Sequence, residues 1–557
     1  MLIGIDVGGT YTDGVLFDGQ SIIRVVKHPS RQDDLKTTIL QVLDDLIIDC
    51  PVDRIQRIVL STTLVTNVIA TDSGEKTAIL LLPGPGLPWE AYQMVEPCFF
   101  ARGSIDFRGR VLEDLDVEEI KDIAAQIKEM GINKIAVAGK FSNRNPEHEQ
   151  RVYKILKTFN PDWDVVLGSE VAGALNFRRR LITTYYTAMT RQAWEDFEHE
   201  ILEAIQERGI SASVHILKAD GGTMPADVAR KKPCETIFSG PAASTMGGVA
   251  LVQSTENTVV LDIGGTTTDI SLLIDGEPLY ASRGAKINQQ YTHIKSFAVR
   301  SIALGGDSPV AYSQGPEIHT KRLGPAVCFG GNVPTVIDVF NVRHEMGIGN
   351  QQASYEALNV LAETAKIEVD KLCEELEEAV LGRLRTNIEQ MFTEWEQEPA
   401  YRVWEVVNAR KFELHNIVGI GAAAEAIVPL LAKNMGVEPV LHRYSSVANA
   451  LGACVARPTL FLRIHVDTQT GIYTNDQTGL TGQISNRRAF QMEDAQLLAQ
   501  QQLSELASQQ DMEDYASEAE ITLAEQFNVI RGWDTRGKIF EVGIQIAPGL
   551  IQEFKGA

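Results

Sequence analysis

The chain has 557 residues, of which 44% are hydrophobic and 22% are charged. A chain of this length exceeds what one hydrophobic core can sustain, so we expect several domains with a cleft between them. Its 74 acidic and 51 basic residues give a formal net charge of −23. Such a field repels nucleic-acid backbones and anionic lipid heads, so we expect a protein that binds neither nucleic acid nor membranes.

Cysteine and histidine usage argues against metal and disulfide chemistry. The six cysteines form no C-x-x-C pair, and the ten histidines form no H-x-H or H-x-x-x-H pair. We therefore expect no disulfide framework and no dedicated zinc site. The N-terminus has no basic leader, and the most apolar later run, residues 417–432, is too short to span a bilayer. These features favour a cytoplasmic location.

Short apolar runs alternate with helix-period stretches in the first third of the chain. The expected strands are 2–7, 13–18, 57–60, 77–82 and 134–138, and the expected helices are 33–48 and 116–130. Alternation of this kind predicts an α/β lobe, which we place at residues 1–185.

The alternation begins again in residues 186–458, which predict a second lobe. An amphipathic stretch at 185–208 leads to the expected strands 214–218 and 258–261, and residues 352–398 predict one or two long covering helices. After Pro458 the pattern changes. A helix at 493–512 and strands at 519–523 and 538–546 predict a small C-terminal α/β region, residues 459–557.

Two eight-residue segments are nearly identical. Residues 6–13 read DVGGTYTD and residues 262–269 read DIGGTTTD, an agreement at six of eight positions. Each segment lies between two apolar strand runs, whereas the Rossmann and Walker A motifs need a strand, a turn and then a helix. A Gly-Gly pair can simply close a hairpin. Two copies with the same acids and threonines indicate a shared ligand instead.

The residue types of this repeat predict a nucleotide phosphate and a metal ion. Glycine lets backbone N–H groups approach a phosphate, and threonine hydroxyls add donors. Carboxylates repel phosphate, so their presence implies Mg²⁺ between them. We expect ATP and Mg²⁺ as cofactors, with Asp6 and Asp262 as catalytic residues and Asp6, Asp262 and Asp269 as metal ligands. The expected phosphate-binding residues are Gly8, Gly9, Thr10, Tyr11, Thr12, Gly264, Gly265, Thr266, Thr267 and Thr268.

Paired phosphate hairpins across a cleft are the arrangement of the superfamily that contains actin, sugar kinases and heat-shock chaperones. We therefore expect an α/β, two-lobed actin-like (ribonuclease H-like) ATPase fold with a small C-terminal α/β appendage. An apolar strand run followed by a small-residue turn at 417–425 resembles the adenosine motif of that superfamily. This resemblance assigns Gly419, Gly421, Ala422 and Glu425 to nucleotide binding.

Further segments together resemble the hydantoinase A and 5-oxoprolinase family, whose relatives include acetone and acetophenone carboxylase subunits. They are T-T-x-x-T-N at 62–67, D-G-G-T-M at 220–224, S-G-P-A-A at 239–243, the region 324–338, and the S-x-x-x-A-L-G-A stretch at 446–453. The similarity runs from residue 2 to about 458, and it rests on the order in which these segments follow one another.

The resemblance implies an ATP-dependent hydrolase of a cyclic amide such as a hydantoin, 5-oxoproline or a lactam, in which phosphorylation of the carbonyl oxygen precedes ring opening. The substrate is then a small molecule with an amide or ketone carbonyl. A hydantoinase B-type subunit is a candidate partner, and a homo-oligomer is expected. Arg180 is assigned to clamping a phosphoryl or carboxylate group and Asp338 to acid–base or metal chemistry, with a solvated basic patch and a helix cap as their alternatives.

Three other functions use the same phosphate turns. A carboxylase subunit would phosphorylate bicarbonate or an enolised ketone, and a small-molecule kinase would release a stable phosphorylated product. A non-metabolic ATPase, such as an enzyme-reactivating factor, would couple ATP cleavage to a change in a partner protein. The sequence leaves these alternatives open.

Overall fold

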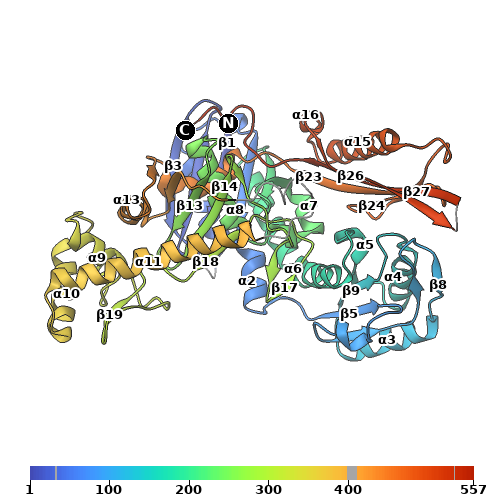
Figure 1. Ribbon diagram of the computed structural model, residues 1–557, viewed down its shortest axis with the longest axis horizontal. Helices are drawn as coiled ribbons and strands as arrows, with labels where there is room; N and C mark the ends of the chain where they lie inside the picture. Colours follow the sequence, from blue (N-terminus) through green and yellow to red (C-terminus); the bar gives the residue numbers. More distant parts are fainter. Residues whose placement is uncertain (32–33, 398–410, 532–533, 557) are drawn as a thin grey trace.

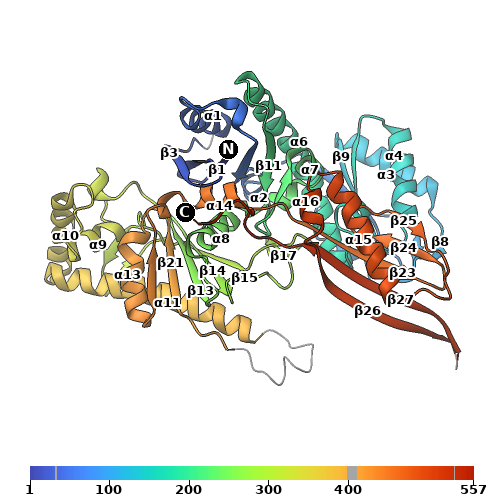
Figure 2. The same cartoon turned by 90° about the horizontal axis from the view of Figure 1, so that it is seen from above.

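Two six-stranded sheets, each carrying one of the glycine hairpins, lie next to each other in the molecule (Figures 1 and 2). The computed structural model describes residues 1–31, 34–397, 411–531 and 534–556. Two further α/β units flank the first sheet: a four-stranded one from the N-terminal half and a five-stranded one from the C-terminus.

The first sheet is built from the start of the predicted first lobe and from a segment beyond its end. Its strands are, in spatial order, β12 (Thr223–Pro225), β11 (Ser213–Leu217), β4 (Arg57–Thr62), β1 (Leu2–Val7), β2 (Tyr11–Phe17) and β3 (Ile22–Pro29). Helix α1 (Leu35–Leu46) covers β2 and β3, and Asp34 caps it by accepting a bond from the Thr37 N–H. Strands β11 and β12 belong to this sheet, so the predicted second-lobe strand at 214–218 belongs to the first lobe.

Helix α6 (Phe177–Glu207) is one continuous helix, and the predicted domain boundary at residue 185 falls inside it. The reason is that the amphipathic stretch expected from residue 185 starts eight positions earlier, where Asn176 caps the helix by accepting a bond from the Arg179 N–H. The short helices α2 (Leu64–Ala70) and α7 (Ala226–Lys231) pack against α6.

The four-stranded sheet is fully parallel and forms a separate small α/β unit (Figure 1). Its strands are β10 (Asp164–Leu167), β9 (Lys134–Gly139), β5 (Thr77–Leu82) and β6 (Cys98–Phe100), accompanied by α3 (Val117–Glu129), α4 (Glu147–Phe159), α5 (Gly168–Val171) and the hairpin of β7 (Ser104–Ile105) and β8 (Val111–Glu113). Every residue of β5 and β9 is buried, as expected of parallel strands covered on both faces. The predicted strands 77–82 and 134–138 and the helix at 116–130 are confirmed.

The second six-stranded sheet carries the second hairpin. It contains β15 (Glu277–Pro278), β14 (Thr268–Ile274), β13 (Thr258–Ile263), β21 (Asn416–Ile420), β22 (Glu438–Leu441) and β18 (Val299–Ile302), which pairs with β14. Small two-stranded pieces follow: β16 (Lys286–Ile287) with β17 (Gln290–Tyr291), and β19 (Val310–Tyr312) with β20 (Pro316–Ile318).

Long helices cover this second sheet, as residues 352–398 predicted. They are α9 (Val336–Arg343), α10 (Gln351–Ala365), α11 (Val369–Glu396) and α13 (Ala424–Met435). The predicted stretch splits into α10 and α11 at Lys366, whose φ of 58° ends the first helix. Residue 398 lies outside the described residues.

Helices α8 (Ser239–Val252) and α14 (Ala448–Val455) cross between the two large sheets (Figure 2). Helix α14 packs on β1 and β2, and α8 packs against β13 and β21. A Cβ at Gly452 would lie 2.3 Å from the Gly247 backbone nitrogen, so only glycine permits the two helices to approach this closely. This crossing holds the two hairpins in a fixed relation.

The C-terminal region is an antiparallel sheet with a helix on one face. Its strands are β25 (Thr481–Gln483), β24 (Ile472–Asn475), β23 (Leu460–Asp467), β27 (Asp534–Ile546) and β26 (Glu520–Arg531), and its helices are α15 (Met492–Ser508) and α16 (Glu513–Ala516). Ala495, Ala499 and Leu503 of α15 are buried against the sheet. Within the described ranges, no helix is both long and apolar enough to cross a membrane.

Candidate active site

The two glycine hairpins border one cavity of about 620 Å³, which we call the hairpin cavity. Both hairpins close in the same way. The Gly8 N–H donates to the Tyr11 carbonyl at 3.0 Å, and the Gly264 N–H donates to the Thr267 carbonyl at 3.0 Å. The sequence repeat is therefore also a structural repeat, and its two copies meet at a cavity of ordinary ligand size.

Only part of each predicted phosphate turn reaches this cavity. The predicted residues that border it are Gly8, Gly9, Thr10, Tyr11, Gly264, Gly265, Thr266 and Thr267. Thr12 and Thr268 are fully buried and do not border it. The Thr12 hydroxyl lies 2.9 Å from the Ser30 hydroxyl, and the Thr268 hydroxyl donates to the Leu304 carbonyl at 2.7 Å. Their prediction as phosphate donors is wrong, because each is already part of a strand and faces the opposite side.

Five carboxylates border the hairpin cavity, and four of them belong to the hairpins: Asp6, Asp13, Asp262 and Asp269. Asp6 is paired in register with Asp13, and Asp262 with Asp269. Burial, with the neighbouring charges of Asp13 and Asp262, raises the pKa of Asp6 to about 7, although a hydrogen bond with Ser61 acts against this. Burial and the charge of Asp262 raise the pKa of Asp269 to about 6. The cavity is thus an electrostatic environment in which acidic groups outnumber basic ones.

Asp262 is held in place from the two crossing helices. The Ser244 hydroxyl of α8 donates to Asp262 Oδ2 at 2.5 Å, and the Asn449 amide of α14 donates to the same oxygen at 2.9 Å. A Cβ at Gly421, whose φ is +85°, would lie 2.5 Å from Asp262 Oδ1. The side chain is therefore fixed by partners from three separate segments.

These carboxylates fit a hydrated cation such as Mg²⁺. Asp6 Oδ1 is buried and has no hydrogen-bond partner, which is a costly arrangement for a carboxylate without a cation. Among the described residues, no three His, Cys, Asp or Glu side chains form a ready-made metal cage. Mg²⁺ commonly takes one or two carboxylates, with waters and substrate phosphates completing its shell. Asp6 and Asp262 are the residues that would hold it, and the ion would supply positive charge to the phosphates.

Lys27 is a cavity residue that sequence reasoning missed. It lies on β3 directly opposite Asp13, and its amine donates to both Asp13 oxygens at 2.7 and 3.0 Å. It also donates to the Ser446 carbonyl at 3.0 Å and lies 5.2 Å from the centre of the Tyr11 ring. No motif surrounds Lys27 in the sequence, and only the pairing of β3 with β2 places it beside Asp13.

A second missed feature is the loop that supports the second hairpin. The N–H groups of Gly306 and Asp307 donate to the carbonyls of Gly264 and Gly265 at 2.9 and 2.8 Å. Asp307 and Arg322 both border the cavity and form an ion pair of 2.7 Å. Burial raises the pKa of Asp307 although Arg322 opposes this. The sequence signal was the Gly-Gly-Asp run that begins at residue 305.

Part of the small-residue turn at the end of β21 forms a wall of the hairpin cavity. Gly421 and Ala422 border the cavity. Gly419 and Glu425 do not, so their assignment to nucleotide binding is not supported by the structure. Gly419 lies inside β21, where a Cβ would be 2.7 Å from Leu441, and Glu425 is exposed in the first turn of α13.

Motif segments from distant parts of the chain also meet at the hairpin cavity. Thr63, Gly240, Pro241, Ser446 and Asn449 all border it. They come from the segments at 62–67, 239–243 and 446–453. Motif segments that lie far apart in the sequence therefore meet at one place in the fold.

Arg180 does not reach the hairpin cavity, and the structure contradicts its catalytic assignment. Its guanidinium is buried and donates to the backbone carbonyls of Ala172 at 3.0 Å, Gly139 at 3.1 Å and Ala174 at 2.6 Å. Burial lowers its pKa to about 10. This buried guanidinium ties α6 to the four-stranded sheet through three backbone carbonyls and lies away from the hairpin cavity.

Asp338 is likewise a structural residue, and its prediction as an acid–base or metal group is not supported. It is the third residue of α9 and forms a capping box with Thr335. Its oxygens also accept bonds from the N–H groups of Val327 and Cys328 at 2.9 Å and from the Ser354 hydroxyl at 2.6 Å. The side chain is fully buried and does not border the cavity.

Family models match most of the chain. The hydantoinase/oxoprolinase N-terminal region matches residues 2–159, and the hydantoinase/oxoprolinase model matches residues 180–460. The chain belongs to the hydantoinase/oxoprolinase family. The resemblance predicted from the motif segments is thus confirmed.

Three curated relatives indicate the range of activities in this family. Caprolactamase subunit alpha of Pseudomonas jessenii is 26% identical over 79% of this chain and 68% of its own length. Acetophenone carboxylase gamma subunit of Aromatoleum aromaticum is 25% identical over 60% of this chain and 52% of its own length. The 5-oxoprolinase of Saccharomyces cerevisiae is 24% identical over 62% of this chain but only 28% of its own length.

Two solved structures share the fold over nearly the whole chain. The ATP-dependent caprolactamase from Pseudomonas jessenii aligns with a TM-score of 0.73 and 19% identity, over 98% of this chain and 87% of that one. Nucleotide-free acetone carboxylase aligns with a TM-score of 0.70 and 16% identity, over 99% of this chain and 88% of that one. The mixed α/β architecture is therefore shared with both enzymes.

Proposed function

We propose that this chain binds Mg-ATP between its two hairpins and uses it to phosphorylate the carbonyl oxygen of a cyclic amide. The observation that carries the proposal is one cavity bordered by both hairpins and by five carboxylates. The fold is then a two-lobed actin-like ATPase, with one phosphate hairpin in each lobe.

Phosphoryl transfer requires mainly positioning and charge neutralisation, and the hairpin cavity suits both. The glycine turns present backbone N–H groups and threonine hydroxyls, which bind phosphate oxygens through charge-assisted bonds of roughly 1.5–3 kcal/mol each. Asp6 and Asp262 are the residues we assign to the metal. Lys27 neutralises Asp13 and leaves that side of the cavity less negative.

An amide carbonyl resists water because its leaving group is poor. Transfer of a phosphoryl group to the oxygen makes the carbon a better electrophile. One water then adds to this carbon and the ring C–N bond breaks, which frees the amine and leaves an acyl phosphate. A second water hydrolyses the acyl phosphate to the carboxylate and phosphate. The relative that is a caprolactamase subunit and the relative that is a 5-oxoprolinase support a lactam-type substrate. Since the chain spans only part of these relatives, the complete reaction is part of the proposal.

A carboxylase subunit is the second candidate. The match to the acetophenone carboxylase gamma subunit favours it, because the same cavity would serve phosphorylation of bicarbonate or an enolised ketone. In both cases we propose that a second, B-type subunit takes part, since caprolactamase and acetophenone carboxylase relatives are named as subunits.

The test is ATP turnover by the purified chain, alone and with a B-type subunit. Release of ADP and phosphate is measured with caprolactam, 5-oxoproline, a hydantoin, or acetone with bicarbonate. We expect a lactam or hydantoin to stimulate turnover and to give a ring-opened product. Stimulation only by the ketone with bicarbonate would select the carboxylase. A stable phosphorylated product would indicate a kinase, and stimulation only by a protein partner would indicate a reactivating factor.

A further inference from the structure

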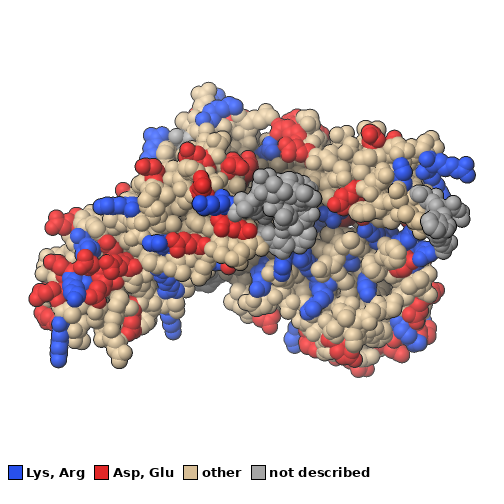
Figure 3. All heavy atoms as spheres, in the orientation of Figure 1, with Lys and Arg blue, Asp and Glu red and all other residues tan. Residues whose placement is uncertain are grey.

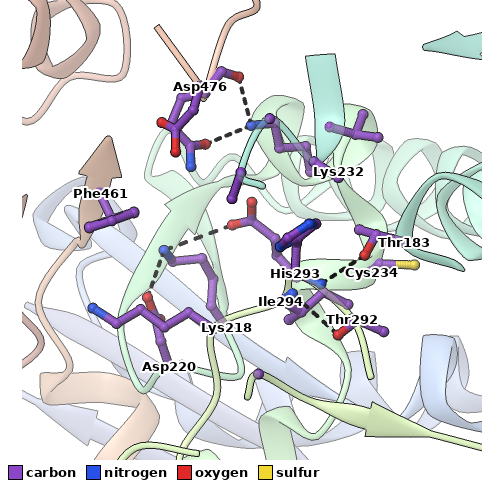
Figure 4. A pocket seen from close by; sticks show the side chains of 18 of the residues that line it. Thr183, Lys218, Asp220, Lys232, Cys234, Thr292, His293, Ile294, Phe461 and Asp476 are labelled. Carbon is purple, nitrogen blue, oxygen red and sulfur yellow. Dashed lines mark hydrogen bonds and ion pairs between the residues drawn. The ribbon is translucent and has the colours of Figure 1, made fainter. Parts of the chain in front are cut away.

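A second cavity of about 470 Å³ shares no bordering residue with the hairpin cavity. Its wall combines α6, the segments around Lys218 and Lys232, the segment 280–295 and the C-terminal region (Figure 4). Phe461 and Asp476 come from the C-terminal region, so the cavity exists only where that region docks on the rest of the chain. None of the functions considered above uses it.

The charge of this cavity is opposite to that of the whole chain. Six of its bordering residues are Lys or Arg and three are Asp or Glu, in a chain with a net charge of −23. The acidic residues are already engaged. Asp220 pairs with Lys218 at 3.2 Å, Lys218 also lies 3.9 Å from Glu235, and Asp476 accepts the Arg463 backbone N–H at 2.6 Å.

Five cations at the cavity have no carboxylate partner within 4.0 Å among the described residues: Arg179, Lys232, Arg283, Lys295 and Arg463. Lys232 donates only to Gln477, at 2.8 and 3.1 Å. Lys295 donates to Gln545 and lies 4.5 Å from the Tyr280 ring. Arg463 Nε is buried without any hydrogen-bond partner, which is costly for a guanidinium. These groups are arranged for an anion that is not part of the chain.

The rim of the cavity adds further positive charge. Arg179 and Arg283, which border the cavity, each lie 5.7 Å from the Tyr291 ring, and Lys286 lies 5.6 Å from the same ring. Figure 3 shows Lys and Arg side chains gathered on the face over α6 and β17. Three like charges around one ring repel each other, and a field of this kind attracts an anion toward the cavity.

We propose that the second cavity binds a small organic carboxylate with a short apolar body. The planar Arg463 guanidinium suits a carboxylate, and Lys295 and Lys232 add charge from two other segments. Leu460, Phe461 and Ile294 supply an apolar wall, and the volume exceeds what inorganic phosphate would fill. The site is separate from the nucleotide and does not require the proposed reaction.

The experiment is calorimetric titration of the full chain without ATP. The probes are hexanoate, 5-oxoproline, the uncharged analogue hexanamide, and inorganic phosphate. We expect the carboxylates to bind and hexanamide to bind on the order of 10-fold more weakly or not at all. Arg463→Met and Lys295→Met should each weaken hexanoate binding by about 10-fold. The control Lys154→Met, on the exposed side of α4, should bind as the wild type does.

Several results would overturn the proposal: no carboxylate binds, hexanamide binds as well as hexanoate, or phosphate binds more tightly than either carboxylate. Unchanged binding in both Arg463→Met and Lys295→Met would also overturn it, and circular dichroism checks that each variant is folded. Asp262→Asn should bind hexanoate normally. Loss of binding in that variant would place the carboxylate in the hairpin cavity and refute a separate site, whatever the outcome for ATP turnover.

Discussion

Asp262→Asn is the sharpest perturbation of the hairpin cavity, because it removes one charge and keeps the side-chain shape. The Ser244 hydroxyl and the Asn449 amide both donate to Asp262 Oδ2, and an amide oxygen in that place accepts the same two bonds. We therefore expect the fold to be kept while the charge at the proposed metal site is lost.

Asp262→Asn should lower ATP turnover, but it should leave the stability of the free chain unchanged or raise it. A group that positions a cation at a transferring phosphate contributes on the order of 10²-fold or more to turnover, about 2.7 kcal/mol. Raising the pKa of Asp6 from 3.8 to about 7 costs its ionised form about 4 kcal/mol, mostly through burial and partly through Asp262. Asp262→Asn removes the Asp262 part, so the free chain should unfold at the same temperature as the wild type or higher.

The assay pairs ADP release at saturating Mg-ATP with calorimetric unfolding of the free protein. Asp122→Asn, an exposed change on α3, is the control and should alter neither quantity. Normal turnover in Asp262→Asn would remove that carboxylate from the chemistry. A loss of turnover together with a fall of several degrees in unfolding temperature would show that Asp262 is needed for the fold instead.

Three further outcomes are expected. Because the pKa of Asp6 rises to about 7 on folding, the folded chain holds this proton more tightly than the unfolded chain does. The stability of the chain without a cation should therefore fall as the pH rises from about 4 through 7. Mg-ATP binding, measured by calorimetry, should tighten over the upper part of that range. Gly421→Ala places a Cβ 2.5 Å from Asp262 Oδ1 at a φ of +85°, and should weaken Mg-ATP binding on the order of 10-fold. Arg180→Met removes three hydrogen bonds to backbone carbonyls and should lower the free energy of unfolding by about 3 kcal/mol in urea titrations, with normal ATP turnover per folded molecule.

The hairpins were predictable because everything that defines them is local. Apolar runs on both sides of a Gly-Gly pair predict a strand, a turn and a strand, and the repeat at residues 262–269 indicates a shared role. Strand alternation then decides which threonines reach the ligand. Thr12 and Thr268 face away from the cavity because each already lies in a strand, where side chains alternate between the two faces. Predicting this from sequence requires knowing, to within one residue, where the turn ends.

Long-range pairing explains what the sequence did not show. Arg180 sits beside paired threonines at a position that suits a phosphate clamp, yet its donors go to carbonyls of two other segments. Lys27 has no motif around it and becomes a cavity residue only because β3 pairs with β2. Strand β11 joins the first sheet through a parallel pairing with β4, which no local pattern reveals.

The family-like motif segments divide between the two cavities. Gly240 and Pro241 border the hairpin cavity, whereas Asp220, from the D-G-G-T-M segment, borders the second cavity. The short stretch from Glu235 to Gly240 runs from the wall of the second cavity to that of the hairpin cavity, where α8 begins and soon supplies Ser244 to Asp262. A ligand that moves Glu235 would therefore act on the partner of a proposed metal ligand through one continuous backbone segment.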